Sequence, residues 1–89
     1  MSFHRCAVCQ EDGSLVCKDV TVALEEAGRD DPVAWYGTIT VTHLTSLAAG
    51  QRYRLVLDDG RTGEFLVRRN TFAGDTSRAV AIHGTGPLR

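Results

Sequence analysis

Residues 35–69 read WYGTITVTHLTSLAAGQRYRLVLDDGRTGEFLVRR, and this stretch decides the fold because two alternating segments flank the turn sequence Asp58-Asp59-Gly60. A two-residue turn would set apolar residues opposite charged ones. A three-residue loop, with its glycine in the left-handed conformation, instead sets Tyr53 opposite Phe65. The second register is favoured, so the stretch predicts a β-hairpin.

In this register, each face of the hairpin has one chemical character. The apolar face carries Tyr53, Leu55, Leu57, Phe65 and Val67. The polar face carries Arg54, Thr62, Glu64 and Arg68, with Arg54 opposite Glu64. A two-stranded hairpin is marginally stable in water, so the rest of the chain must supply strands that cover the apolar face.

Three other segments alternate apolar and polar residues, which predicts strands over residues 20–25, 35–42 and 78–83. Residues 18–19 interrupt the first pattern and predict a bulge or a separate short strand. Gly37 lies inside the second segment, where it predicts a bend or a neighbouring strand that passes closely.

The remaining segments are rich in turn-forming residues. Loops are expected over residues 26–32 and 70–77, with Phe72 folded beneath the second loop as a plug for one end of a barrel. The only candidate helical turn lies at residues 43–50. The tail at Gly86-Pro87 is not expected to continue strand pairing.

Five or six short strands with almost no helix predict an all-β fold, a small antiparallel barrel or sandwich of SH3-like or OB-like architecture. At most one short helical turn is expected. We expect residues 1–89 to form one domain, in which residues 1–14 are a cysteine-containing segment that is either a strand or flexible.

Composition is that of an ordinary globular protein, with 43% hydrophobic and 24% charged residues. No apolar run reaches the length of a transmembrane helix, so no membrane association is expected. The opening MSFHRCAVC lacks the features of a secretory signal, which favours a cytoplasmic location. Three cysteines are an odd number, which argues against a simple disulfide framework.

The N-terminal segment contains the only spacing typical of a metal site. Cys6 and Cys9 form a CxxC pair that could grip one zinc ion, with Cys17 and His4 as third and fourth ligands. The alternative is that the three cysteines are small, partly buried apolar residues near a strand and a turn. No cofactor is otherwise expected.

The same segment resembles the opening of a PHD finger, in which a CxxC pair precedes an acidic, glycine-containing turn and a Leu-x-Cys. The matching elements here are Asp12-Gly13 and the tripeptide at residues 15–17, and the resemblance covers fewer than twenty residues. It implies zinc binding. Val20 stands where such a finger would have another cysteine, and the histone-reading function of that family is therefore not carried over.

Charge is unevenly distributed although the net charge is only −1. Residues 1–49 carry three basic and seven acidic side chains, whereas residues 50–89 carry seven basic and four acidic ones. This asymmetry suggests a nucleic-acid surface on the second half, or simply a mixed surface once the strands pair. The candidate nucleic-acid-binding residues are Arg52, Arg54, Arg68, Arg69 and Arg78, with Tyr36 for stacking.

No nucleophile elbow, Walker loop, zinc-protease motif, EF-hand or dinucleotide fingerprint occurs, so an enzyme is disfavoured and no catalytic residue is assigned. His43 and His83 are interpreted as isolated surface residues. The leading hypothesis is a small non-enzymatic cytosolic module that binds a protein or a second copy of itself through available sheet edges. The alternatives are an electrostatic nucleic-acid binder and a zinc-stabilised interaction domain.

Overall fold

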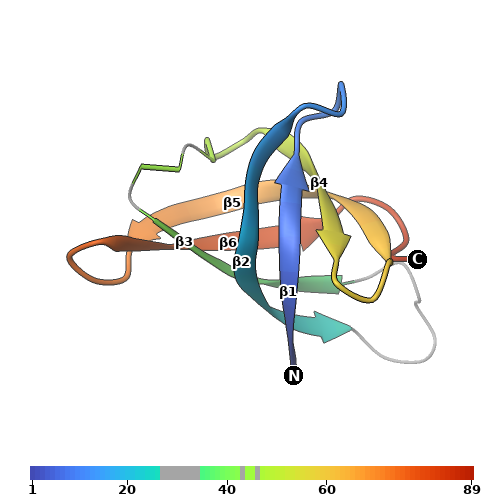
Figure 1. The fold of residues 1–89 in the computed structure, drawn as a ribbon, viewed down its shortest axis with the longest axis horizontal. Coiled ribbons are helices and arrows are strands. Elements are labelled where there is room, and N and C mark those ends of the chain that lie inside the picture. The colour runs from blue at the N-terminus through green and yellow to red at the C-terminus, as the bar shows by residue number, and fades with distance from the viewer. Residues whose placement is uncertain (27–34, 43, 46) are drawn as a thin grey trace.

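The computed structural model describes residues 1–26, 35–42, 44–45 and 47–89, and it shows six antiparallel strands (Figure 1). The strands are β1 (Ser2–Cys9), β2 (Leu15–Glu26), β3 (Trp35–Thr42), β4 (Arg52–Leu57), β5 (Thr62–Phe72) and β6 (Ser77–Gly84). They form a closed barrel in the order β1-β2-β3-β6-β5-β4. The all-β barrel class predicted from the sequence is therefore confirmed. The expected loop over residues 26–32 falls almost entirely outside the described residues.

The barrel consists of two three-stranded meanders, β1-β2-β3 and β4-β5-β6, joined where β3 pairs with β6 and β1 pairs with β4. Closure matters for function, because a closed sheet has no edge strand that runs its full length. Partial edges remain, because residues 2–5 of β1 have no ladder partner on β4 and residues 15–20 of β2 have none on β3. Within the described residues, no helix is long and apolar enough to cross a membrane.

The central hairpin has the predicted register. Tyr53 pairs with Phe65, and Arg54 pairs with Glu64. Gly60 has a φ of 94°, a backbone conformation that only glycine adopts readily, so it can end the three-residue loop. The backbone amide of Leu57 donates to the carbonyl of Arg61 across that loop, over 2.8 Å.

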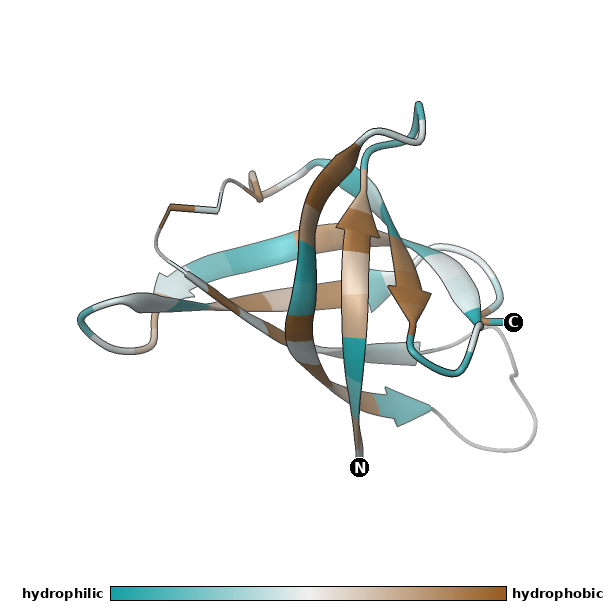
Figure 2. Cartoon of the chain, viewed as in Figure 1, coloured by the Kyte–Doolittle hydropathy of each residue, from teal (hydrophilic) through white to brown (hydrophobic). Residues whose placement is uncertain are grey.

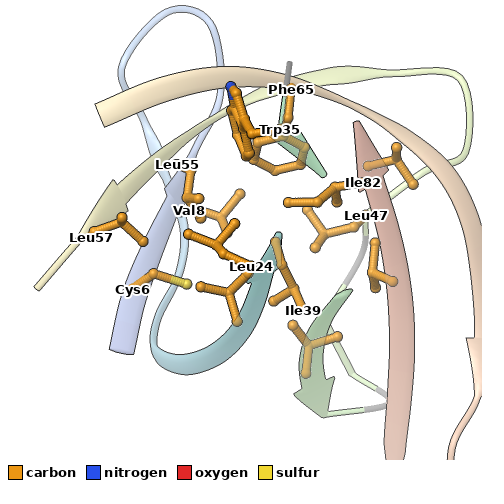
Figure 3. Close-up of a cluster of buried hydrophobic side chains, with 14 residues drawn as sticks. Cys6, Val8, Leu24, Trp35, Ile39, Leu47, Leu55, Leu57, Phe65 and Ile82 are labelled. Carbon is orange, nitrogen blue, oxygen red and sulfur yellow. The ribbon is translucent and has the colours of Figure 1, made fainter. Parts of the chain in front are cut away.

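The barrel interior is filled by the inward-facing side chain of every second strand residue (Figure 3). Figure 2 shows hydrophobic residues along the strands, with continuous hydrophobic runs at the ends of β1 and β4. Trp35 and Phe65 make an edge-to-face contact with ring centroids 6.5 Å apart. The fully or nearly fully buried residues are Cys6, Val8, Val22, Leu24, Trp35, Ile39, Val41, Leu47, Leu55, Leu57, Phe65, Val67, Val80 and Ile82.

Close approach explains two glycines inside this barrel. A Cβ atom at Gly37 would overlap the backbone carbonyl of Ala23 on β2, which bears out the predicted close neighbour. A Cβ atom at Gly84 would overlap the indole ring of Trp35. At both positions, a larger side chain would force two strands or a core ring to move.

The N-terminal segment is strand β1, the first of the two alternatives left open by the sequence. It forms a hairpin with β2, and the connecting turn is held by a 2.8 Å hydrogen bond from the backbone amide of Gln10 to the carbonyl of Ser14. The predicted irregularity before Val20 is a bulge, at which Asp19 has a φ of 57°. The segment that resembles a PHD finger is therefore an ordinary β-hairpin of the barrel wall.

Two local expectations are wrong: where strand β5 ends and which residue covers the end of the core. Strand β5 continues to Phe72 instead of ending before a loop, and the Phe72 ring is 72% exposed with the Arg78 guanidinium 4.2 Å from its centroid. The hydrophobic plug is Leu47 instead, whose side chain is 1% exposed. As expected, Gly86-Pro87 is not part of a strand, although Arg89 beyond it exchanges two backbone hydrogen bonds of 2.8 Å with Thr62.

The segment at residues 43–50 contains no helical turn among its described members. His43 and Ser46 lie outside the described residues, and the others form turns around Leu44 and at residues 49–50. Two interactions hold the segment in place: burial of the Leu47 side chain, and a 2.8 Å hydrogen bond from Asn70 Nδ2 to the carbonyl of Leu47. Burial of Leu47 thus fixes this segment, whereas the sequence suggested that local helical hydrogen bonds would do so.

Candidate ligand-binding groove

A bulge in β5 gives the outer surface its main concentration of positive charge. Val67 pairs with Ile82 on β6, and the next pair along the ladder joins Arg69 to Ala81, so Arg68 is skipped. Without this extra residue, strand alternation would turn Arg69 toward the barrel interior. With it, two consecutive arginines are both exposed while the flanking side chains remain directed inward. The β5 segment that carries them is hydrophilic in Figure 2.

Beside these arginines, small residues form a shallow groove across three strands. Ala23 on β2 pairs with Thr38 on β3, and Thr38 pairs with Ala81 on β6. These short side chains leave a hollow of about 580 Å³ on the outside of the barrel. Its principal lining residues are Tyr36, Thr38, Arg68, Arg69, Ala81 and His83. We call this hollow the outer groove.

Tyr36 and His83 form one wall of the outer groove. They are directly paired across β3 and β6, and the Tyr36 side chain is 48% exposed. The one acidic residue among those that line the groove, Glu25, lies 3.5 Å from the N-terminal ammonium group. Neither Arg68 nor Arg69 forms an ion pair with another described residue. The groove therefore offers two cationic groups without an acidic partner among the described residues, and the phenol ring of Tyr36 beside the imidazole of His83.

The six residues proposed for nucleic-acid binding are thus divided by the fold. Tyr36, Arg68 and Arg69 meet in the outer groove. The other three lie elsewhere. Arg54 is 3.6 Å from Glu64, and Arg78 stacks on Phe72.

Arg52 lines a different hollow, of about 770 Å³, between the β1–β2 turn and the segment that follows β3. That hollow also contains Glu11 and Asp12, so its charges are mixed and give it no preference for an anion.

His83 is the groove residue that sequence reasoning missed. In the sequence it stands 47 positions after Tyr36 and has no partner in any motif. Its role in the groove follows only from the pairing of β3 with β6, which joins residues far apart along the chain. The alternation at residues 78–83 predicted a strand that includes His83, but it did not show that this strand pairs with the one that contains Tyr36.

The candidate zinc ligands do not form a metal site. In an extended strand, residues three apart face opposite sides, so Cys6 points into the core while Cys9 points away from it. All three cysteines are free thiols. Among residues 1–26, 35–42, 44–45 and 47–89, no group of three or more histidine, cysteine or acidic side chains could hold a metal ion.

Burial controls the chemistry of Cys6. Removal from water, with smaller contributions from Cys17 and Asp58, raises the pKa of the Cys6 thiol from 9.0 to about 12. At neutral pH this environment favours the protonated thiol over the thiolate. The cysteines of the two paired strands thus act as small core and boundary residues, which was the alternative interpretation from the sequence.

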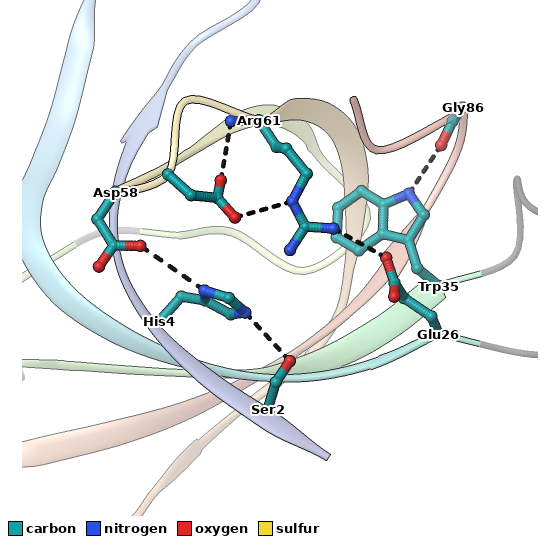
Figure 4. A network of polar contacts seen from close by, with 8 residues as sticks. Ser2, His4, Glu26, Trp35, Asp58, Arg61 and Gly86 are labelled. Carbon is teal, nitrogen blue, oxygen red and sulfur yellow. Dashed lines mark hydrogen bonds and ion pairs between the residues drawn. The ribbon is translucent and has the colours of Figure 1, made fainter.

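A second polar constellation lies at the barrel end near the N-terminus (Figure 4). His4 Nε2 lies 3.1 Å from Ser2 Oγ, and His4 Nδ1 lies 3.6 Å from Asp58 Oδ1. These are the residue types of a catalytic triad, but 3.6 Å is too long for the hydrogen bond that would orient the imidazole. The Asp58 side chain is also 56% exposed, so water competes for its carboxylate.

This constellation belongs instead to a set of contacts that tie strands to the β4–β5 loop. The backbone amide of Asp58 donates to the carbonyl of Arg5 on β1 over 2.8 Å. Arg61 bridges Glu26 on β2 and Asp59 in the loop, at 3.1 and 3.0 Å. The hydrogen bond from the Arg61 backbone amide lowers the pKa of the Asp59 carboxyl, and the Arg61 guanidinium lowers it further. These contacts hold the loop against the barrel end.

Comparison of the chain with protein-family models, with curated proteins and with solved structures gives no match. Any function must therefore be argued from the geometry of the molecule itself.

Proposed function

We propose that this protein is a small non-enzymatic binding module that holds a polyanionic ligand in the outer groove. The observation that carries the proposal is the β5 bulge, which sets Arg68 and Arg69 side by side on the surface without an acidic partner among the described residues. Bulges commonly re-aim side chains at functional sites. Two unpaired guanidinium groups on adjacent residues of one strand can bind neighbouring anionic groups of the same ligand.

Assembly through strand edges is the weaker alternative. Closure of the barrel pairs each strand on both sides over part of its length, which leaves only short edges as a template for adding a strand from another chain. The outer groove takes the place of the edge as the contact surface. A binding role without catalysis also agrees with the long separation between His4 and Asp58.

We also place the protein in the cytosol. Three free thiols and no cross-strand disulfide suit a reducing compartment. The zinc-stabilised alternative is not proposed, because β1 separates the CxxC thiols between two faces of the sheet.

A titration with a size-defined heparin fragment, followed by ¹⁵N NMR at low salt, tests the proposal. We expect the largest amide shifts at Tyr36, Arg68, Arg69 and His83. The double variant R68Q/R69Q should abolish these shifts, whereas R54Q/R78Q, which removes the same charge outside the groove, should retain them. Equal loss in both double variants would mean that only net charge matters, and the proposal would be wrong.

A further inference from the structure

We infer that the polyanion bound by the outer groove is single-stranded nucleic acid, with a base stacked on Tyr36 and phosphates bound by Arg68 and Arg69. This inference rests on the function proposed above. It adds the chemical class of the ligand, which must combine repeated negative charge with flat rings.

The ring requirement comes from Tyr36. Its side chain leaves the sheet close to perpendicular, as strand side chains do, and about half of it is exposed beside the small side chains of Thr38 and Ala81. A polyphosphate has no ring that could stack on Tyr36, and the saturated rings of a polysaccharide have no π-face. A nucleotide base has a flat π-face that can stack on the tyrosine, while the adjoining phosphate reaches the arginines.

The groove floor suits a strand that crosses the sheet. One outward-facing row of directly paired residues runs from Phe3 through Ala23, Thr38 and Ala81 to Arg69. The four strand spacings in this row span about 19 Å, which is long enough for several nucleotides. Phe3, at the far end of the row, is 69% exposed and offers a second aromatic surface. A polymer that follows this row would meet a ring at one end and a cation at the other.

A duplex fits this surface poorly. Paired bases are stacked on one another, so their faces are not accessible to Tyr36. The described residues also include no helix that could enter a major groove. Among polyanions, an unpaired strand is the one that uses both the ring and the two arginines.

Fluorescence anisotropy with a labelled twelve-residue oligothymidylate tests the inference. Its comparison ligands are an abasic strand with the same number of phosphates, a duplex of the same length and the heparin fragment. We expect the thymidine strand to bind about tenfold more tightly than the abasic strand. Y36A should remove this preference and Y36F should retain it, because phenylalanine keeps the ring. Both substitutions lie on the surface, and unfolding curves will verify that the variants are folded.

The salt dependence supplies a second readout. Each phosphate contact with a single strand contributes about 0.7 to the slope of log affinity against log salt, so R68Q/R69Q should make the slope shallower by about 1.4. R54Q/R78Q should leave the slope unchanged.

The outcomes separate the inference from the proposed function. If heparin and the abasic strand bind in the groove as tightly as the thymidine strand, the ligand is a polyanion of another class and the inference is wrong, while the proposed function stands. Tighter binding of the duplex likewise overturns the inference. If no polyanion shifts the groove amides, both are wrong.

Discussion

The indole ring of Trp35 lies directly against Gly84, so closely that a Cβ atom on residue 84 would overlap the ring. The same indole donates a 2.7 Å hydrogen bond from Nε1 to the carbonyl of Gly86 (Figure 4). Trp35 opens β3 and the two glycines end β6 and begin the tail, so this contact fastens the C-terminal end of the chain to the barrel. The side chain is also 1% exposed, and its polar group is therefore satisfied where water is excluded.

Substitution of Gly84 should show how tightly this end is packed. We expect G84A to lower the free energy of unfolding by about 1–3 kcal/mol, because the added methyl group must displace the indole or the strand. G86A is the matched control, since a Cβ at residue 86 has no neighbour within 4 Å. Urea unfolding measures both. Equal stability of G84A and G86A would contradict the packing described here.

Alanine substitution of the two leucines in the segment after β3 should have very different effects on the free energy of unfolding. L47A should lower the free energy of unfolding by about 2–5 kcal/mol, because it leaves a cavity at the end of the core. L44A should change it by less than about 0.5 kcal/mol, because the Leu44 side chain is 83% exposed. Thermal or urea unfolding will distinguish them. A comparable loss in both variants would mean that Leu47 is not the plug.

Stability should depend on alkaline pH through Cys6. The folded thiol titrates with a pKa of about 12 and the unfolded thiol near 9.0, so the folded protein binds more protons between these values. The contribution of the protonated Cys6 thiol to the free energy of unfolding is complete below about pH 9 and is lost as pH rises toward 12. Urea unfolding across this range should show a smaller decline for C6A than for the wild type. An unchanged slope in C6A would assign the decline to other groups.

The Ser2–His4–Asp58 constellation should have no hydrolytic activity. We expect the protein to cleave p-nitrophenyl acetate no faster than free imidazole at the same concentration, because the imidazole lacks a hydrogen-bonded carboxylate to orient it. S2A and H4N should leave that rate essentially unchanged or reduce it only by the loss of one exposed imidazole. A rate well above this background that S2A abolishes would show that the protein is an enzyme.

Local periodicity was a reliable guide wherever one face of a strand is buried. The register of Tyr53 with Phe65 followed from matching apolar faces, and the bulge before Val20 followed from a break in the alternation. Strand β1 was harder to assign, because its inward positions carry Cys6 and Val8 while its exposed face carries the large side chain of Phe3. Exposed and buried apolar residues look alike in a single sequence.

The same ambiguity explains the errors at the barrel ends. Phe72 and Leu47 are both apolar residues within turn-rich segments, and only packing decides which one covers the core. The bulge at Arg68 and Arg69 could not be predicted from the sequence. The alternation of apolar residues ends at Val67, so two adjacent arginines after it interrupt no pattern.

The sequence by itself determined the strands from β2 to β6, the central hairpin and the alternation that places apolar side chains on one face, because these depend on neighbours two residues apart or on one short turn. Tertiary structure alone decided that the sheet closes, that β3 lies beside β6, and that Tyr36, His83, Arg68 and Arg69 share one groove. Those relationships join residues tens of positions apart. Their physical basis is burial of the common core. This burial stabilises the complete arrangement of strands, and no single segment of the sequence shows which strands will pair.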